Sequence, residues 1–257
     1  MRSLAPREHG AYGQLGFPLL TALCVARPRL PGTLFAAAAV ALFLAHEPAL
    51  VAFGRRGQRA REEDGGRARR MLLSTLAAGA ALGLAGVWLS PAPARLAAAV
   101  AAAAGGLLTL AVALRIEKTL PGELLAAAAM TSAGLPVAVA DGVSWPLAVS
   151  IWGAWMFAFA AAVFPVRSAM VEHRQRQESP WVRVTGTLLA VAFAAVLAAA
   201  GELPRDLVLA DLPLFLASMF VALRPPSMKQ MTRAGWTLMV AGAVTAALMI
   251  GVVRAKG

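Results

Sequence analysis

The sequence predicts an all-helical, polytopic membrane protein with about nine transmembrane helices. Hydrophobic residues make up 59% of the 257 residues and charged residues only 14%, a composition far outside that of a soluble domain. The apolar residues gather in stretches of roughly 17 to 22 residues, which is the length that a helix needs to cross about 30 Å of hydrocarbon. Proline- and glycine-containing turns alternate with arginine-rich connections between these stretches.

Nine stretches in chain order have this character. They run over Gly10–Ala26, Leu34–Phe53, Met71–Leu89, Leu96–Leu114, Leu120–Val139, Trp145–Val166, Trp181–Ala200, Leu207–Leu223 and Ala234–Val253. Three connections are short turns, and two longer ones, Arg55–Arg70 and Arg167–Arg183, are predicted to be basic loops. The Gly105-Gly106 pair predicts a close contact with a neighbouring helix. The single cysteine, Cys24, rules out an internal disulfide.

The positive charges predict the orientation. With the N-terminus inside, 18 of the 24 Lys and Arg residues fall on the inner side, and basic residues next to spans are retained in the cytoplasm. We therefore expect a protein of the bacterial inner (cytoplasmic) membrane, with its N-terminus cytoplasmic and its C-terminus outside. The net charge of +11 follows from this topology and favours contact with membrane lipids, so we expect no nucleic-acid partner.

A duplication is predicted from two similar stretches. The sequence from Pro48 to Arg59 and the sequence from Pro165 to Arg176 share four of twelve residues at a fixed offset, and each closes the second span of a four-span block. The chain is expected to form one transmembrane domain, residues 1–257, with pseudo-repeats over about 8–115 and 120–223 and a last helix over 234–253. Pro48 is expected to kink its helix and open a polar cavity to the cytoplasm.

The candidate functional residues lie at the inner ends of the helices. Each of the three histidines has a glutamate beside it, and an ionisable residue within a membrane is by default a functional hypothesis. His46, Glu47 and Glu123 are the predicted catalytic residues, with His46 or Glu47 as a general base. The predicted substrate-binding residues are Glu8, His9, Tyr12, Gln14, Arg55, Arg56, Arg167, Glu172, His173 and Arg174. A divalent metal on His9, His46, Glu47 and His173 is a further hypothesis, because imidazole and carboxylate ligands suit iron, zinc and manganese.

Several motifs resemble the YwiC-like family of bacterial membrane proteins. The opening stretch from Pro6 to Tyr12, followed by Pro18, is similar to the first motif of that family. His46-Glu47-Pro48 through Gly57, and Val166-Arg167-Ser168, resemble its later inner-face motifs. The resemblance covers most of the chain and implies no particular activity.

A second, more distant resemblance is to the UbiA-type prenyltransferases. It implies nine spans in a UbiA-like bundle, pseudo-repeated halves and functional inner loops after spans two and six, where those enzymes carry aspartate-rich motifs for magnesium and diphosphate. This chain has His46-Glu47-Pro48 in the first place and Arg167, Glu172, His173 and Arg174 in the second. Arginine can hold a diphosphate directly.

Three functions remain open from the sequence. The first is a UbiA-like transferase that binds an anionic-headed lipid or isoprenoid at the cytoplasm-facing polar cavity. The second is a transporter of a small anion along the kinked helices. The third is a metal- or haem-binding membrane protein that uses His9, His46 and His173.

Overall fold

The computed structural model describes residues 4, 9–173, 180–227 and 230–256, and within these ranges all regular structure is helical. The helices in chain order are α1 (His9–Val25), α2 (Leu30–Leu44), α3 (His46–Ala52), α4 (Gln58–Leu89), α5 (Ala92–Ala113), α6 (Leu120–Ser132), α7 (Gly134–Ala140), α8 (Trp145–His173), α9 (Pro180–Ala199), α10 (Arg205–Ala210), α11 (Leu212–Leu223) and α12 (Met231–Lys256). The predicted all-α polytopic fold is confirmed.

Seven helical segments in the described residues are long and apolar enough to cross a membrane. They are Leu30–Ala52, Gln58–Leu89, Ala92–Ala113, Leu120–Ala140, Trp145–Val171, Trp181–Ala199 and Met231–Lys256, and two apolar helices, Gly10–Val25 and Leu212–Leu223, are shorter. The protein is thus a membrane protein with seven candidate spans by length. The expected number of nine is reached only if the two shorter helices also cross.

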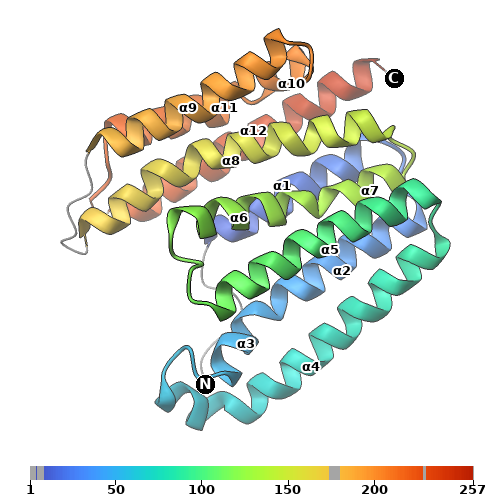
Figure 1. Cartoon of the computed structure of the whole chain (residues 1–257), viewed down its shortest axis with the longest axis vertical. Coiled ribbons are helices and arrows are strands. Elements are labelled where there is room, and N and C mark those ends of the chain that lie inside the picture. The colour runs from blue at the N-terminus through green and yellow to red at the C-terminus, as the bar shows by residue number, and fades with distance from the viewer. Residues whose placement is uncertain (1–3, 5–8, 174–179, 228–229, 257) are drawn as a thin grey trace.

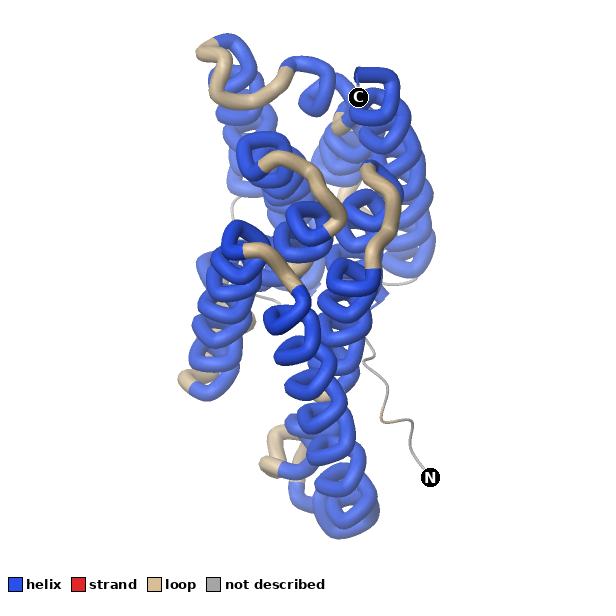
Figure 2. Tube along the Cα trace, turned by 90° about the vertical axis from the view of Figure 1, so that its right-hand side faces the viewer, coloured by secondary structure: helices blue, strands red, loops and turns tan. Residues whose placement is uncertain are grey.

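The helices run side by side between two ends of the molecule (Figure 1). We call the basic end the one formed by the turn 53–57, the connection 114–119, the first half of α4 and the carboxyl end of α8. The turns 26–29, 90–91, 141–144 and 200–204 lie at the opposite end, which Figure 2 shows in front. Because α12 runs toward this opposite end, Lys256 lies far from the basic end (Figure 1).

Three pairs of consecutive helices, α2–α3, α6–α7 and α10–α11, are each separated by a single residue that lies shortly before a proline. The breaks fall at Ala45, Ala133 and Asp211, and Pro48, Pro136 and Pro213 follow them by three, three and two residues. A proline has no N–H for the carbonyl four residues earlier, and its ring clashes with that carbonyl, so the helix ends there and restarts. The kink expected at Pro48 is confirmed.

The helices approach one another closely where a large side chain meets a glycine. On α4, Cβ atoms added to Gly79 and Gly86 would stand 2.7 Å from the Leu42 Cδ2 and 2.9 Å from the Phe35 Cε1 of α2. On α12, a Cβ on Gly242 would stand 2.6 Å from the Phe17 ring of α1. Small residues permit this close packing in membranes, where no hydrophobic effect drives helices together.

Two expectations from the sequence are wrong. A Cβ on Gly105 or Gly106 would meet no atom of the described chain within 4 Å, so this pair makes no close contact between helices. The predicted loop Arg55–Arg70 is helical from Gln58 onward, and the predicted loop Arg167–Arg183 is helical up to His173 and again from Pro180. The residues of Arg55–Arg70 include good helix formers, and the Arg59 Nε donates to Glu63 one turn later at 2.7 Å, which supports the helix.

The buried core consists of two large clusters that share helices and a small third one, in which Val51 and Ala52 of α3 pack with Ala68 of α4 and with Leu4. One large cluster joins α1, α2, α5, α7 and the start of α8, and the other joins α6 and the middle of α8 to α9, α10, α11 and α12. Helices α1 and α8 contribute to both large clusters. The proposed pseudo-repeats, 8–115 and 120–223, therefore pack through common helices rather than as separate cores.

Candidate functional site

Glu47 forms a bidentate ion pair with Arg56 at the basic end. The Arg56 Nε donates to Glu47 Oε1 at 2.9 Å, and its Nη2 donates to Oε2 at 2.6 Å. The Glu47 side chain is only 1% exposed and that of Arg56 is 35% exposed. A charge as deeply buried as this carboxylate is tolerated when it is paired and hydrogen-bonded on both oxygens.

The break between α2 and α3 positions the Glu47–Arg56 ion pair. Glu47 is the second residue of α3, directly after the interruption that Pro48 causes. Gly54 and Gly57 have positive φ angles of 74° and 94°, which glycine adopts without strain. The turn between them folds back over α3, as the Arg55 N–H donates to the Leu50 carbonyl at 2.8 Å, and it returns the Arg56 guanidinium to Glu47.

A second ion pair joins α6 to α8. The Arg167 Nη1 donates to Glu123 Oε1 at 3.2 Å, and the two side chains are 18% and 20% exposed. Glu123 lies in the first turn of α6, where the Thr119 hydroxyl caps the helix by accepting from the Gly122 N–H at 3.3 Å. A carboxylate is favoured at this position, because the N-terminus of a helix carries partial positive charge.

The connection between α5 and α6, residues 114–119, lies between the two ion pairs. The Arg55 Nη2 donates to the Ala113 carbonyl at 2.9 Å, and the Arg167 Nη1 also donates to the Lys118 carbonyl at 2.6 Å. Arg115 adopts a left-handed conformation with φ of 62°, which is rare and costly outside glycine, asparagine and aspartate. Backbone strain of this kind occurs preferentially at functional sites.

Glu117 in this connection was not among the predicted site residues. Its Oε2 is buried and has no hydrogen-bond partner in the described part of the chain. A buried carboxylate oxygen without a partner is costly, so Glu117 joins the candidate site. Its place as the one carboxylate between the fourth and fifth predicted spans was the sequence signal that could have identified it.

The other predicted site residues are placed less completely. The Tyr12 ring meets Phe43 edge-on, with centroids 5.1 Å apart, which sets α1 beside the end of α2. His46 is exposed and Gln14 is half-buried. Glu8 and Arg174 lie outside the described residues, and so do the side chains of His9, Glu172 and His173.

The metal hypothesis is not tested by these contacts. Among the described side chains, no three His, Cys, Asp or Glu residues gather as a metal site. Since the side chains of His9 and His173 are not among them, a metal on His9, His46, Glu47 and His173 stays a prediction.

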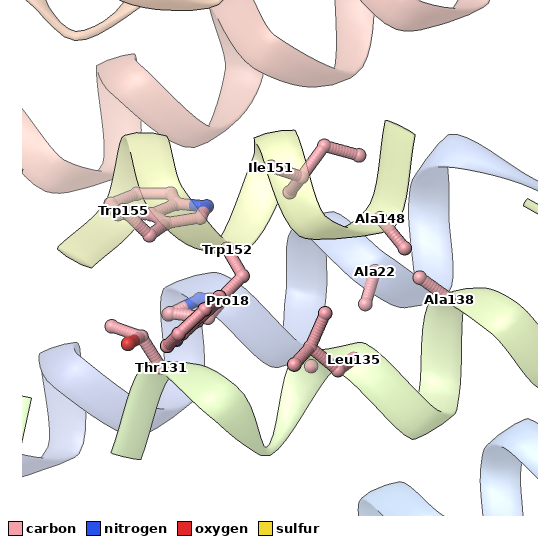
Figure 3. Close-up of a pocket in the computed structure, with 10 residues that line it drawn as sticks. Pro18, Ala22, Thr131, Leu135, Ala138, Ala148, Ile151, Trp152 and Trp155 are labelled. Carbon is pink, nitrogen blue, oxygen red and sulfur yellow. The ribbon is translucent and has the colours of Figure 1, made fainter. Parts of the chain in front are cut away.

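The centre of the molecule holds a small apolar cavity, shown in Figure 3. It lies between α1, α7 and α8, and Pro18, Thr131 and Trp152 are among its lining residues. Its volume of about 10 Å³ is at the lower limit for one water molecule. Trp155 is fully buried beside it, stacked on Phe17 and Phe159, with its Nε1 donating to Thr21 Oγ1 at 3.2 Å. Trp155 therefore serves packing.

Comparison with known proteins gives one match. The family model described as YwiC-like protein matches residues 5–139, which include the opening motif, Glu47, Arg56, the α5–α6 connection and Glu123. No curated protein and no solved structure matches the chain. The similarity to UbiA-type prenyltransferases thus stays a hypothesis that rests on the expected number of spans, the pseudo-repeated halves and the position of the inner loops.

Proposed function

The chain belongs to the YwiC-like family, whose model matches more than half of its length, and on that premise we propose that it binds an anionic-headed lipid or isoprenoid at the basic end. The observation that carries this proposal is the presence of two ion pairs at the basic end, Glu47 with Arg56 and Glu123 with Arg167. Arg55 and Arg167 also bind the Ala113 and Lys118 carbonyls at the two ends of the α5–α6 connection. An ionisable residue within a membrane segment is by default a functional hypothesis, and a buried salt bridge is weak evidence for a role in stability.

In this proposal the guanidinium groups hold the head group. Arg55, Arg56, Arg167 and Arg174 supply planar, permanently charged donors that match phosphate oxygens. The alkyl chain lies between apolar helices. The rest of the binding site is formed by the other predicted substrate-binding residues, Glu8, His9, Tyr12, Gln14, Glu172 and His173. A divalent metal on His9, His46, Glu47 and His173 would add charge neutralisation for a diphosphate.

The proposed reaction is transfer of the lipid group, as in a UbiA-like transferase. His46 or Glu47 then removes a proton from the acceptor as a general base, and Glu123 is the second carboxylate of the site. Arg56 binds both oxygens of the buried Glu47, so the exposed His46 is the better placed of the two for this role. We place the protein in the bacterial cytoplasmic membrane with the basic end in the cytoplasm, as the distribution of arginine favours.

Mass spectrometry of copurifying lipids tests this proposal. Wild-type protein is purified in mild detergent together with the variants His46→Ala and Glu47→Gln, and bound isoprenoids and other anionic lipids are quantified per protein. We expect a bound anionic-headed lipid in the wild type and a loss of at least about tenfold in Glu47→Gln, the factor that about 1.4 kcal/mol of binding free energy represents. The loss follows because Arg56 no longer has the carboxylate that holds its guanidinium in place.

The matched control is Glu63→Gln, which removes the carboxylate of the exposed ion pair with Arg59 and should leave lipid binding unchanged. Equal retention of lipid by the wild type and Glu47→Gln would contradict the proposal. Metal analysis of the same samples tests whether a divalent metal is bound and whether the His46→Ala variant loses it.

Transport of a small anion is the second candidate function, and the three interruptions between consecutive helices favour it. Broken helices line the substrate sites of many transporters, and here the breaks fall at Ala45, Ala133 and Asp211. Anion flux into vesicles that contain the wild-type protein, abolished in Glu47→Gln, would favour transport over transfer.

A further inference from the structure

An open groove lies between the end of α3 and the first half of α4. Its volume is about 530 Å³, and its lining residues are Ala52, Phe53, Arg61, Arg69, Leu72 and Leu73. Neither Glu47 nor Arg56 is among these residues. The groove is thus a feature separate from the two ion pairs.

The groove combines two kinds of surface. Phe53 and Leu73 are large apolar side chains that are 73% and 67% exposed. Arg69 precedes Leu73 by four residues on the same face of α4, one turn closer to the basic end. On a membrane-spanning helix such apolar side chains face the lipid, and basic residues at the border of this surface are placed to meet anionic head groups.

Arg61 lies over the turn that ends α3. A Cβ on Gly54 would stand 3.5 Å from the Arg61 Cδ and 3.8 Å from its Nη1, which is ordinary contact distance, so the Arg61 side chain packs beside this turn. Arg61 thereby reaches the level of Phe53, although its Cα lies two turns of α4 farther from the membrane than that of Arg69.

The depth of the groove matches the border between head groups and hydrocarbon. The predicted apolar span in α4 begins at Met71. At 1.5 Å per residue, Arg69 stands about 6 Å before Leu73 along the helix, and the head-group layer on each side of the hydrocarbon is about 5–8 Å thick. Arg69 therefore lies at head-group level while Leu72 and Leu73 enter the hydrocarbon, and Arg61 approaches this level through its side chain, which packs beside Gly54.

We propose that this groove binds an anionic phospholipid, with the phosphate held by Arg61 and Arg69 and an acyl chain lying against Phe53, Leu72 and Leu73. Charge complementarity supports this occupant, since α4 also carries Glu62, Glu63 and Asp64 but none of them lines the groove. Glu63 accepts instead from Arg59. The site is independent of the proposed transferase or transport function.

Lipid titration of the purified, full-length protein tests this site. Native mass spectrometry in detergent measures the binding of phosphatidylglycerol and of phosphatidylcholine with identical acyl chains. We expect wild-type protein to prefer phosphatidylglycerol. Arg61→Gln combined with Arg69→Gln should weaken its binding by roughly fivefold for each arginine, because one basic residue at a membrane surface contributes about that factor. Phe53→Ser with Leu73→Ser should also weaken the binding of phosphatidylglycerol, since the acyl chain loses two of the apolar side chains against which it lies.

The matched control combines Arg59→Gln with Arg70→Gln, which removes the same charge from α4 at exposed positions outside the groove. This control should bind phosphatidylglycerol as the wild type does. The proposal is overturned if the Arg61/Arg69 variant also binds like the wild type, or if the control loses as much affinity. Displacement of the lipid by millimolar inorganic phosphate would likewise overturn it, by identifying a site for a free anion. Isoprenoid retention in the Arg61/Arg69 variant reports separately on the proposed function.

Discussion

Glu47 and Asp141 are carboxylates with almost no exposure, and their surroundings accommodate charge in different ways. Glu47 receives a guanidinium on both oxygens. Asp141, at the opposite end of the molecule, accepts the Arg29 N–H at 2.8 Å on Oδ1, while its Oδ2 has no partner within the described chain. Gly32 leaves room for this contact, because a Cβ there would overlap the Asp141 carboxylate.

Stability should depend on pH through Asp141. Burial raises the pKa of the Asp141 carboxyl above its ordinary value, and the N–H and guanidinium of Arg29 offset this only in part. Because the folded-state pKa is raised, the stability that the neutral acid contributes is present below the ordinary value of about 3.9 and is lost as the pH rises through the folded-state pKa.

The variant Asp141→Asn checks this dependence. An amide keeps an acceptor for the Arg29 N–H and carries no charge, so we expect the melting temperature of the wild type to fall relative to that of Asp141→Asn between pH 4 and pH 7 in detergent. A difference between the two proteins that stays constant with pH would contradict the raised pKa.

At the scale of helices, α4 depends on glycine for its contact with α2. Gly86→Val places methyl groups where the Phe35 ring lies, and overpacking of this kind costs about 1–3 kcal/mol. We therefore expect a lower melting temperature. Gly105→Val makes the same chemical change in α5, where a Cβ meets nothing within 4 Å, and should leave the melting temperature nearly unchanged. Equal changes in melting temperature for the two substitutions would show that helix propensity, and not packing against α2, determines the effect of replacing these glycines.

Most helices could be predicted from the sequence, because an apolar run of fixed length is a strong signal. The predicted stretch Ala234–Val253 falls within α12, Met231–Lys256. The start of α4 was missed, since Gln58 to Arg70 is polar and forms a helix that extends beyond the apolar run. The absence of a close contact at Gly105-Gly106 could not be predicted either, because small residues show where a helix can approach but not whether one is there.

The candidate site was predicted in part. Glu47 was identified because it stands inside an apolar stretch, and the structure adds its partner, Arg56. The link through the Ala113 and Lys118 carbonyls could not be predicted, since backbone acceptors leave no mark in a sequence. Glu117 was not predicted as a site residue, because the burial of its carboxylate depends on how the α5–α6 connection folds.

At the scale of the whole molecule, the distribution of arginine predicts that the basic end faces the cytoplasm. Single cysteines introduced for Gln58 and Glu202, both exposed and at opposite ends of the bundle, test this in a Cys24→Ser background. A membrane-impermeant maleimide should label the Glu202→Cys protein in intact cells and the Gln58→Cys protein only after permeabilisation. The reverse pattern would invert the orientation and place the ion pairs outside the cell.

The contact of α1 with α12 bears on how this protein is made. Phe17 lies against Gly242, so the partner of α1 is a helix that leaves the ribosome only after α2 to α11 have been translated. Until then the surface of α1 must be covered by lipid or by the insertion machinery. A chain that stalls before α12 lacks this partner, and the exposed face of α1 gives quality-control proteases a means to recognise unfinished copies.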